Sequence, residues 1–348
     1  MSDLLLRDFE PRPKLVSRET VVTHPRHPVF DVHNHLGPEF GGNWIARPVD
    51  ELIAAMDRLG ISRLVDLDGG WGGAIFDAHL AHFKEPYPDR FLVFGGIEWP
   101  RWAEEGDRFG EASARRLEAE VRRGAEGLKV WKVLGLRVRD HRGVRVPVDD
   151  PRLDPVFETA AELHIPVLIH IADPIAFFDP ADRFNEQVEV LQQVPDWHFY
   201  GPEFPPFQQL MDEFVARFER HPRATFIAAH VASYPENLGW VGSMLDAHPN
   251  VYVDISARIN ELGRQPYTAR DFLIRYQDRI LFGSDCPPGS DSYPLYYRFL
   301  ETWDEYFDYG GGLGRWRIYG VSLPDEVLDK LYRRNAERVI LRQTANAA

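Results

Sequence analysis

The chain has 348 residues, of which 44% are hydrophobic and 13% aromatic, and its formal net charge at pH 7 is −14. This apolar content is enough for a large buried core and excludes an intrinsically disordered chain. The negative charge argues against nucleic acid and against an anionic membrane surface as partners, because both are bound through basic surfaces. The single cysteine, Cys286, excludes a disulfide framework and a cysteine-rich zinc site. We therefore expect a soluble protein that acts on a small-molecule substrate.

Residues 1–27 are predicted to form an extended arm, because residues 7–28 contain four prolines and show little periodicity. The start of the chain lacks the basic segment and the long apolar run of a signal peptide. No apolar segment reaches the length of a membrane span. These features predict a cytoplasmic location.

Eight short apolar runs recur along the rest of the chain, each with the length of a buried parallel strand. They are residues 29–32, 61–67, 91–97, 127–133, 166–169, 225–229, 251–255 and 280–282. The stretches between them have helical periodicity, as in Leu52, Met56 and Leu59 before a stop at Gly60. Alternating strands and helices predict a single α/β domain over residues 28–348, a closed (β/α)8 TIM barrel rather than an open doubly wound sheet.

The longest insertion in this pattern, residues 171–206, follows the fifth strand and contains His198 among several aromatic residues. A long loop on the functional face of a barrel usually shapes the substrate pocket. The same loop is compatible with a contact in a homodimer. A glycine-rich run at residues 310–320 is predicted to be a hinge or cover, since it lacks the Lys-Ser or Lys-Thr of a phosphate-binding loop.

The first apolar run ends in two histidines, His33 and His35, which are separated by one residue. Side chains alternate across a strand, so these two are expected to share a face with Asp31. Two neutral imidazoles pointing into one space are the start of a divalent metal site. A His-x-His pair also occurs by chance on solvated strands, so its meaning depends on the polar residues at the other strand ends.

Three more metal-competent side chains stand at strand ends: His170 ends the fifth strand, His230 ends the sixth, and Asp285 follows the eighth. The carboxyl ends of the strands form the rim where the active sites of barrel enzymes assemble. A polar group buried there without a partner costs about 1–3 kcal/mol, and coordination of a metal removes that cost. We therefore predict that these side chains converge with His33 and His35 on one metal site.

The ordered set of Asp31-Val32-His33-Asn34-His35, His170, His230 and Gly283-Ser284-Asp285-Cys286-Pro287 resembles the amidohydrolase superfamily. The branch that it resembles includes aminocarboxymuconate-semialdehyde decarboxylase and several lactone hydrolases. The resemblance extends from about residue 28 to residue 336.

The resemblance implies one metal ion, usually zinc, held by His33, His35, His170 and Asp285, with His230 beside it as acid or base. Manganese is the alternative ion. Other branches hold two metals bridged by a carboxylated lysine on the fourth strand, which would make Lys129 and His230 additional ligands. We favour one metal, and the binuclear arrangement stays open.

A bound divalent ion lowers the pKa of its water from about 16 toward about 7. Asp285 is then expected to accept a proton, and His230 to orient the water and pass the proton onward. This chemistry predicts a metal-dependent hydrolase of a small, carboxylated lactone or amide. The same groups can protonate a carbon while carbon dioxide leaves, so a decarboxylase of the aminocarboxymuconate-semialdehyde type is the alternative. A metal-binding protein without turnover is the alternative from another class.

Several residues near strand ends are candidates for substrate binding. Arg47, in the loop after the first strand, is suited to bind a substrate carboxylate bidentately, and a surface salt bridge is the alternative at that position. The remaining candidates are Trp71, Glu98, Trp99, His198 and Arg258.

Overall fold

The computed structural model describes residues 3–5, 8–9, 12–38, 42–289, 291–310 and 315–342. Within these ranges, no helix combines the length and the apolar content that crossing a membrane requires. Residues 311–314 of the predicted glycine-rich hinge lie outside the described residues.

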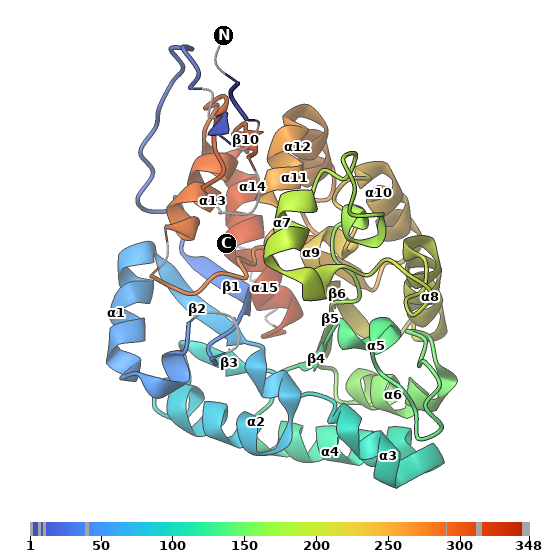
Figure 1. The fold of residues 1–348 in the computed structure, drawn as a ribbon. Helices are drawn as coiled ribbons and strands as arrows, with labels where there is room; N and C mark the ends of the chain where they lie inside the picture. Colours follow the sequence, from blue (N-terminus) through green and yellow to red (C-terminus); the bar gives the residue numbers. More distant parts are fainter. Residues whose placement is uncertain are drawn as a thin grey trace.

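Eight parallel strands form the centre of the molecule (Figure 1). They are β1 Val29–Asn34, β2 Ile61–Asp66, β3 Phe91–Val93, β4 Leu128–Val130, β5 Pro166–Ile169, β6 Thr225–Ala228, β7 Val251–Asp254 and β8 Ile280–Leu281. Strands β1 to β3 pair in chain order, and so do β4 to β8. Backbone hydrogen bonds close the two remaining seams, from Lys129 to Gly95 at 2.8 Å and from Val32 to Phe282 at 3.0 Å. The predicted (β/α)8 barrel is confirmed.

Helices surround the strands on the outside of the barrel (Figure 1). The longer ones are α1 Val49–Leu59, α2 Gly73–His79, α4 Phe109–Arg123, α6 Asp154–Glu162, α8 Phe207–Arg220, α10 Leu238–Ala247, α12 Pro266–Arg275 and α13 Ser292–Glu301. The shorter ones are α3 Trp102–Glu105, α5 Val133–Leu136, α7 Val188–Gln193, α9 Ala229–Ala232, α11 Ile259–Arg264, α14 Asp325–Asp329 and α15 Asn335–Val339. Helix α1 ends as predicted at Gly60, which has a φ of 71° that suits glycine.

The inward side chains of the strands fill the barrel with an apolar cluster. Its members include Phe30, Val32, Val65, Leu92, Leu168, Ile227 and Leu281. Ala336 and Val339 of α15 join this cluster. Arg342, beyond α15, donates a hydrogen bond to the carbonyl of Leu163 just before β5. Helix α15 and Arg342 therefore cover the amino-terminal end of the barrel, and the carboxyl end is left for the polar residues.

The side-chain alternation expected along β1 is interrupted, because its register against β2 shifts between Asp31 and Asn34. The Asp31 carboxylate accepts hydrogen bonds from the hydroxyl groups of Ser284 and Tyr293, both at 2.6 Å. Burial raises the pKa of Asp31 to about 6. Asp31 therefore ties β1 to the segment after β8 and to α13, and it does not join the two histidine rings.

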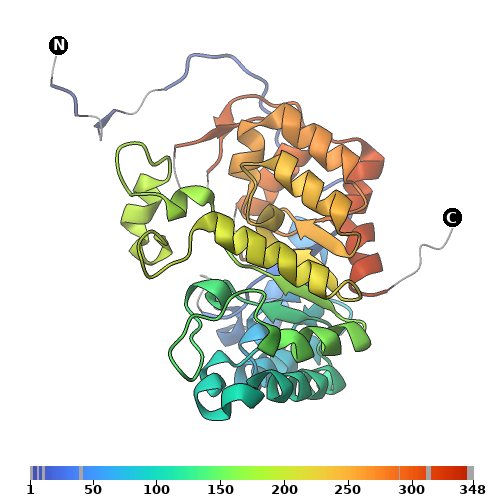
Figure 2. The ribbon, with the colours of Figure 1, turned by 90° about the vertical axis from the view of Figure 1, so that its right-hand side faces the viewer.

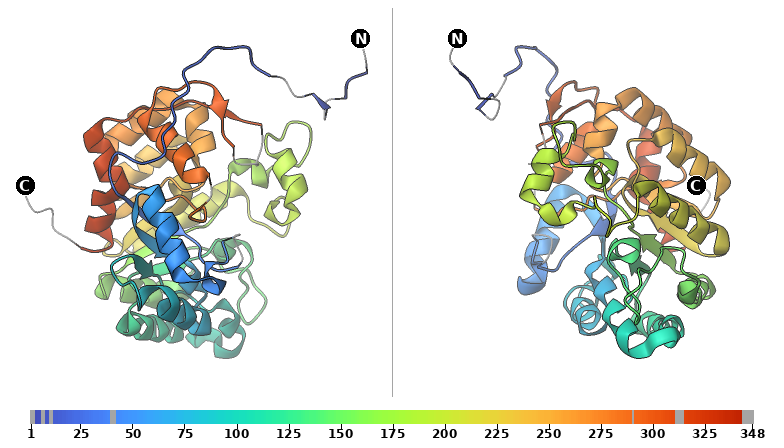
Figure 3. Two further views of the ribbon diagram at one scale, coloured as in Figure 1. Left: turned by 90° about the vertical axis from the view of Figure 1, so that its left-hand side faces the viewer. Right: turned by 45° about the vertical axis from the view of Figure 1, so that its right-hand side comes forward.

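The insertion after β5 and the amino-terminal arm are both peripheral. The insertion carries α7 and projects from one side of the barrel (Figure 2). The arm runs over the orange and red part of the chain before it enters β1 (Figure 3). It is held there by Thr20, whose backbone N–H and hydroxyl group donate to the Asp304 carboxylate at 2.6 and 2.7 Å.

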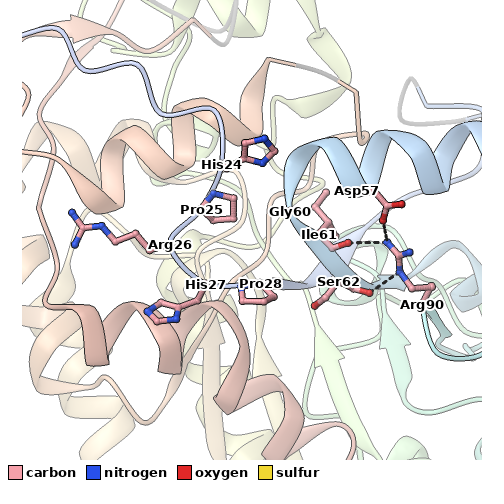
Figure 4. A pocket seen from close by; sticks show the side chains of 10 residues that line it. All are labelled: His24, Pro25, Arg26, His27, Pro28, Asp57, Gly60, Ile61, Ser62 and Arg90. Atoms are coloured by element: carbon pink, nitrogen blue, oxygen red, sulfur yellow. Dashed lines mark hydrogen bonds and ion pairs between the residues drawn. The ribbon is translucent and has the colours of Figure 1, made fainter.

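A cavity of about 520 Å³ opens between the arm and the start of β2 (Figure 4). Arg90 lines it and donates to the Asp57 carboxylate at 2.7 Å. Arg26 also lines the cavity, and its side chain points away from Arg90 (Figure 4). Its Nε lies 3.5 Å from the Glu301 carboxylate. Because this cavity lies at the amino-terminal ends of the strands, it is separate from the polar residues at the carboxyl ends.

Candidate active site

His33 and His35 are each fixed from behind by a carboxylate. Nδ1 of His33 lies 2.9 Å from Oδ2 of Asp254, and Nδ1 of His35 lies 2.8 Å from Oδ1 of Asp68. A carboxylate on Nδ1 orients the ring and leaves Nε2 for a metal ion. Burial lowers the pKa of His33 well below its ordinary value, and the Lys129 cation lowers it further. His33 is therefore neutral, which is the form that binds metals.

Asp285 is brought to these two imidazoles by the segment after β8. Its backbone N–H donates to the carbonyl of His33 at 2.9 Å, and its φ of 55° lies in the left-handed region. Asp285 Oδ1 lies 3.4 Å from Nε2 of His35 and 4.0 Å from Nε2 of His33. Burial raises the pKa of the Asp285 carboxyl. Ligand atoms of the three residues lie within 4.8 Å of one another, so three of the four predicted ligands converge.

His230 follows β6 in a turn whose residues, from His230 to Ser233, have φ values between 55° and 58°. Its Nδ1 lies 2.9 Å from the carbonyl oxygen of Ser256, and its backbone N–H donates to Asp254 at 3.0 Å. Its Nε2 is buried and has no hydrogen-bond partner among the described residues. Such a rarely populated backbone conformation persists only where the surroundings enforce it, and it is common at functional sites.

His170 lies against His230, with the ring centres 4.2 Å apart. Its Nε2 is 3.1 Å from the carbonyl oxygen of Ala172 and 3.6 Å from Oδ1 of Asp173. Burial lowers the pKa of His170 to about 4. In this orientation His170 is not part of the group of close donor atoms formed by His33, His35 and Asp285. Its role as a fourth metal ligand therefore stays a prediction.

The two lysines near β4 have opposite environments. Lys129 is in register with the inward residue Leu168, is fully buried, and has no hydrogen-bond partner for Nζ among the described residues. Burial lowers the pKa of Lys129 to about 8. Lys132 lies at the rim, where its Nζ is 2.6 Å from Asp173. Lys129 is thus the lysine that faces inward, and its role in a binuclear site stays a prediction.

The donor set fits a divalent metal ion. His33, His35 and Asp285 offer two nitrogens and one oxygen, a combination found in zinc and other divalent metal sites. A second group of close donor atoms comprises His33, His230 and Asp254. Asp254 already holds the ring of His33 and the backbone of His230, so we interpret its carboxylate as an orienting group.

Two of the predicted substrate-binding residues border this centre. Arg258 is buried, and its Nε has no hydrogen-bond partner among the described residues. The pKa of His230 is lowered first by burial, then by His170, and then by the positive charge of Arg258. Trp71 stacks on Trp131 with ring centres 4.3 Å apart, and Trp131 stacks on His35 at 5.1 Å. A cation and an aromatic wall therefore stand beside the imidazoles.

The other four candidates have partners away from these imidazoles. Arg47 forms a surface salt bridge with Glu51 at 3.0 Å, which is the alternative raised for it. The remaining contacts are Glu98 with Arg101 at 2.7 Å, Trp99 packed on Trp102 and Phe109, and His198 Nε2 at 2.9 Å from the carbonyl oxygen of Asp179. Substrate-binding roles for these four residues stay predictions.

Three residues of the site were not assigned a role from the sequence: Asp68, Asp173 and Trp131. Each lies at the carboxyl end of a strand or within a few residues after it, which is the signal that was available. Aspartates are so common in loops that their position alone does not separate an orienting carboxylate from a surface residue.

Comparisons with known proteins agree with this geometry. The amidohydrolase family model matches residues 30–341. A comparison with curated proteins found no match.

Several solved structures share the fold. A dihydroxybenzoic acid decarboxylase from Polaromonas, described with bound manganese and the inhibitor 2-nitroresorcinol, is 17% identical with a TM-score of 0.58, covering 92% of this chain and 99% of its own. The 2,6-dihydroxybenzoate decarboxylase from Rhizobium is 17% identical with a TM-score of 0.56, covering 91% and 99%. An uncharacterised TIM-barrel protein from Bordetella bronchiseptica is 16% identical with a TM-score of 0.55, covering 90% and 98%. At these identities the likeness establishes the shared barrel, and the family match over most of the chain identifies this protein as an enzyme of the amidohydrolase family.

Proposed function

We propose that this enzyme is a metal-dependent, non-oxidative decarboxylase of a small aromatic or unsaturated carboxylic acid. The observation that carries the proposal is the buried guanidinium of Arg258 beside the imidazoles and Asp285. A desolvated arginine with an unpartnered N–H is suited to hold a carboxylate. The names of the Polaromonas and Rhizobium structures support the same reaction.

The sequence alone favoured hydrolysis of a lactone or amide and left decarboxylation as the alternative. The comparisons support decarboxylation better, because the Polaromonas and Rhizobium structures are named as decarboxylases. Hydrolysis remains the reaction against which the proposal is tested.

We assign the metal to His33, His35 and Asp285, with His170 as the proposed fourth ligand. A divalent ion bound there supplies Lewis-acid chemistry, which polarises the oxygen atoms of the substrate. Zinc is the ion that we propose, and manganese is the alternative that the Polaromonas structure supports. Asp254 and Asp68, which lie at Nδ1 of His33 and His35, would hold the two rings in an orientation suited to binding through Nε2.

Decarboxylation breaks the carbon–carbon bond to the carboxylate, and the electron pair left on the ring or chain carbon takes up a proton. Arg258 positions the carboxylate that leaves as carbon dioxide. Nε2 of His230 and the carboxyl of Asp285 are the titratable groups at the centre that can hold this proton and deliver it to carbon. The stacked Trp71 and Trp131 shield one side of the centre from water.

The test is a direct assay of the two reactions. We expect the zinc- or manganese-loaded enzyme to release carbon dioxide from a hydroxybenzoate panel that includes 2,6-dihydroxybenzoate, with one phenol formed per carbon dioxide. Arg258→Gln should raise KM and lower kcat, whereas Arg142→Gln, which removes an exposed arginine paired with Asp107, should change neither. Opening of lactones or amides without release of carbon dioxide would contradict the proposal and establish the hydrolase.

A further inference from the structure

A second cavity, of about 340 Å³, includes in its lining Lys132, whose partner Asp173 contacts His170 and Arg258 of the candidate active site. One wall comes from the segment after β4, and the other comes from the insertion after β5. The lining residues are Lys132, Val133, Leu136, Arg137, Asp196, Trp197 and Phe199. Both walls thus follow carboxyl ends of strands, the end at which the metal-binding residues converge.

The walls combine positive charge with aromatic surface. Lys132 Nζ lies 5.2 Å from the ring centre of Trp197 and 5.8 Å from that of Phe199. The guanidinium of Arg137 lies 5.8 Å from the Phe199 ring. Apolar surface with a few convergent polar groups is typical of a small-molecule site. These walls suit a planar, apolar body that carries a negative charge.

One carboxylate links the cavity to the metal-binding residues. Asp173 lies 2.6 Å from Lys132 Nζ, 3.6 Å from His170 and 3.6 Å from Arg258. Burial by itself would raise the pKa of Asp173, but the Lys132 ammonium, the contact with His170 and the Arg258 guanidinium outweigh burial and hold the pKa well below its ordinary value. An ammonium group carries three N–H donors. Asp173 takes one of those of Lys132, so the others are available to a ligand in the cavity.

We propose that this cavity is a distal subsite for a second anionic group of the substrate, held by Lys132 and Arg137. The inference rests on the proposed function, because it takes the reacting carboxylate to lie at Arg258 and the metal. It narrows the substrate class to acids with a second carboxylate, or another anion, at the far end of a planar body. Asp196, which also lines the cavity, disfavours ligands with still more negative charge.

The test measures binding without turnover. Isothermal titration calorimetry on the metal-loaded enzyme compares 2-hydroxybenzoate with its 5-carboxy derivative. We expect the dicarboxylate to bind about tenfold more tightly, the gain typical of one charge-assisted hydrogen bond. Lys132→Gln and Arg137→Gln should each remove most of this preference while leaving the affinity for the monocarboxylate unchanged.

Arg142→Gln is the matched control, because it removes an exposed arginine from the same segment outside the cavity and should keep the preference. Equal affinity of the two acids for the wild type, or an equal loss for both acids in each variant, would overturn the subsite. Arg137 is exposed and donates its hydrogen bond to the carbonyl oxygen of Asp196, so its variant remains informative if Lys132→Gln disturbs His170 or the fold. If the enzyme releases no carbon dioxide, the proposed decarboxylase function is wrong. If calorimetry shows no preference for the dicarboxylate over the monocarboxylate, only the proposed subsite is wrong.

Discussion

Two buried polar clusters of this protein differ in how completely their hydrogen bonds are satisfied. The first, between α6 and α8, is built on Arg217, Asp154 and His221. Arg217 donates to Asp154 at 2.6 Å and to the carbonyl oxygens of Val148 and Asp150 at 3.0 and 2.8 Å, and His221 Nε2 lies 3.1 Å from Asp154. All of its charged groups have partners within the protein.

The second cluster, at the carboxyl end of the barrel, leaves polar atoms without hydrogen-bond partners among the described residues. These atoms are Nε2 of His230, Nζ of Lys129 and Nε of Arg258. An unsatisfied buried polar group costs about 1–3 kcal/mol. Such groups call for an explanation, and at a cluster of metal-competent side chains a ligand that supplies the missing partner provides one. The comparison therefore teaches that the first cluster stabilises the fold and that the second is built to bind a metal and a substrate.

The largest effect is expected from removal of a ligand in the second cluster. His35→Ala takes away one of the three converging donors, so the protein should no longer hold a stoichiometric metal ion, and activity should fall by more than about 100-fold, the loss seen for outer-shell partners alone. Metal analysis and steady-state kinetics measure both. His221→Gln, in the first cluster, is the control and should keep the metal. Retention of a full equivalent of metal by His35→Ala would contradict the assignment of the second cluster to metal binding.

Replacement of His230, whose Nε2 has no hydrogen-bond partner among the described residues, should impair catalysis without loss of the metal. His230→Asn is expected to keep the metal content and to lower kcat by about 10²–10⁴-fold, the range for a general acid or base. The measurement pairs metal analysis with single-turnover kinetics. A variant that also loses its metal would show that His230 is a ligand, as in the binuclear alternative.

Disruption of the satisfied cluster should affect stability alone. Arg217→Met leaves Asp154 and two carbonyl groups without their partner, and we expect a loss of about 3–5 kcal/mol in the free energy of unfolding, as for other broken buried ion pairs. Urea denaturation gives this value, and metal content should stay at the wild-type level. A drop in kcat without loss of stability would contradict the assignment of this cluster to the fold.

The buried ammonium of Lys129 should make stability depend on pH. Its pKa is lowered by burial to about 8, so between pH 8 and its ordinary value the unfolded chain binds the proton and the folded protein does not. The free energy of unfolding should therefore rise with pH above 8, by about 1.4 kcal/mol for each pKa unit of the shift. Urea denaturation of the metal-free protein at pH 7.5 and 9.5 tests this rise. Lys129→Met should remove the contribution of Lys129 to this rise in the free energy of unfolding. An unchanged rise in the variant would contradict the assignment of the pH dependence to Lys129.

The smallest effect is expected from the carboxylate behind His35. Asp68→Asn replaces the partner of Nδ1 by a neutral amide, so metal affinity should fall by about 10–100-fold. Competition with a chelator measures the affinity. Asp57→Asn, which alters an exposed ion pair with Arg90, should leave it unchanged. Equal affinities of wild type and Asp68→Asn would show that the ring of His35 needs no orienting carboxylate.

The sequence by itself determined the eight strands, the stop of α1 at Gly60, and the convergence of His33, His35 and Asp285. These features follow from local patterns, because apolar runs predict buried strands and a polar residue at a strand's carboxyl end must face the rim of a barrel. The hydrogen bond from the buried Tyr293 of helix α13 to Asp31 was not expected.

Only the tertiary structure decided which polar groups meet. Asp254 stands 221 positions after His33 in the chain, and Asp173 contacts Lys132 from the segment after β4 and Arg258 from the segment after β7. The register shift in β1 removed Asp31 from the site. Barrel closure and loop packing fix these meetings, and they depend on contacts between distant segments that local sequence patterns do not contain.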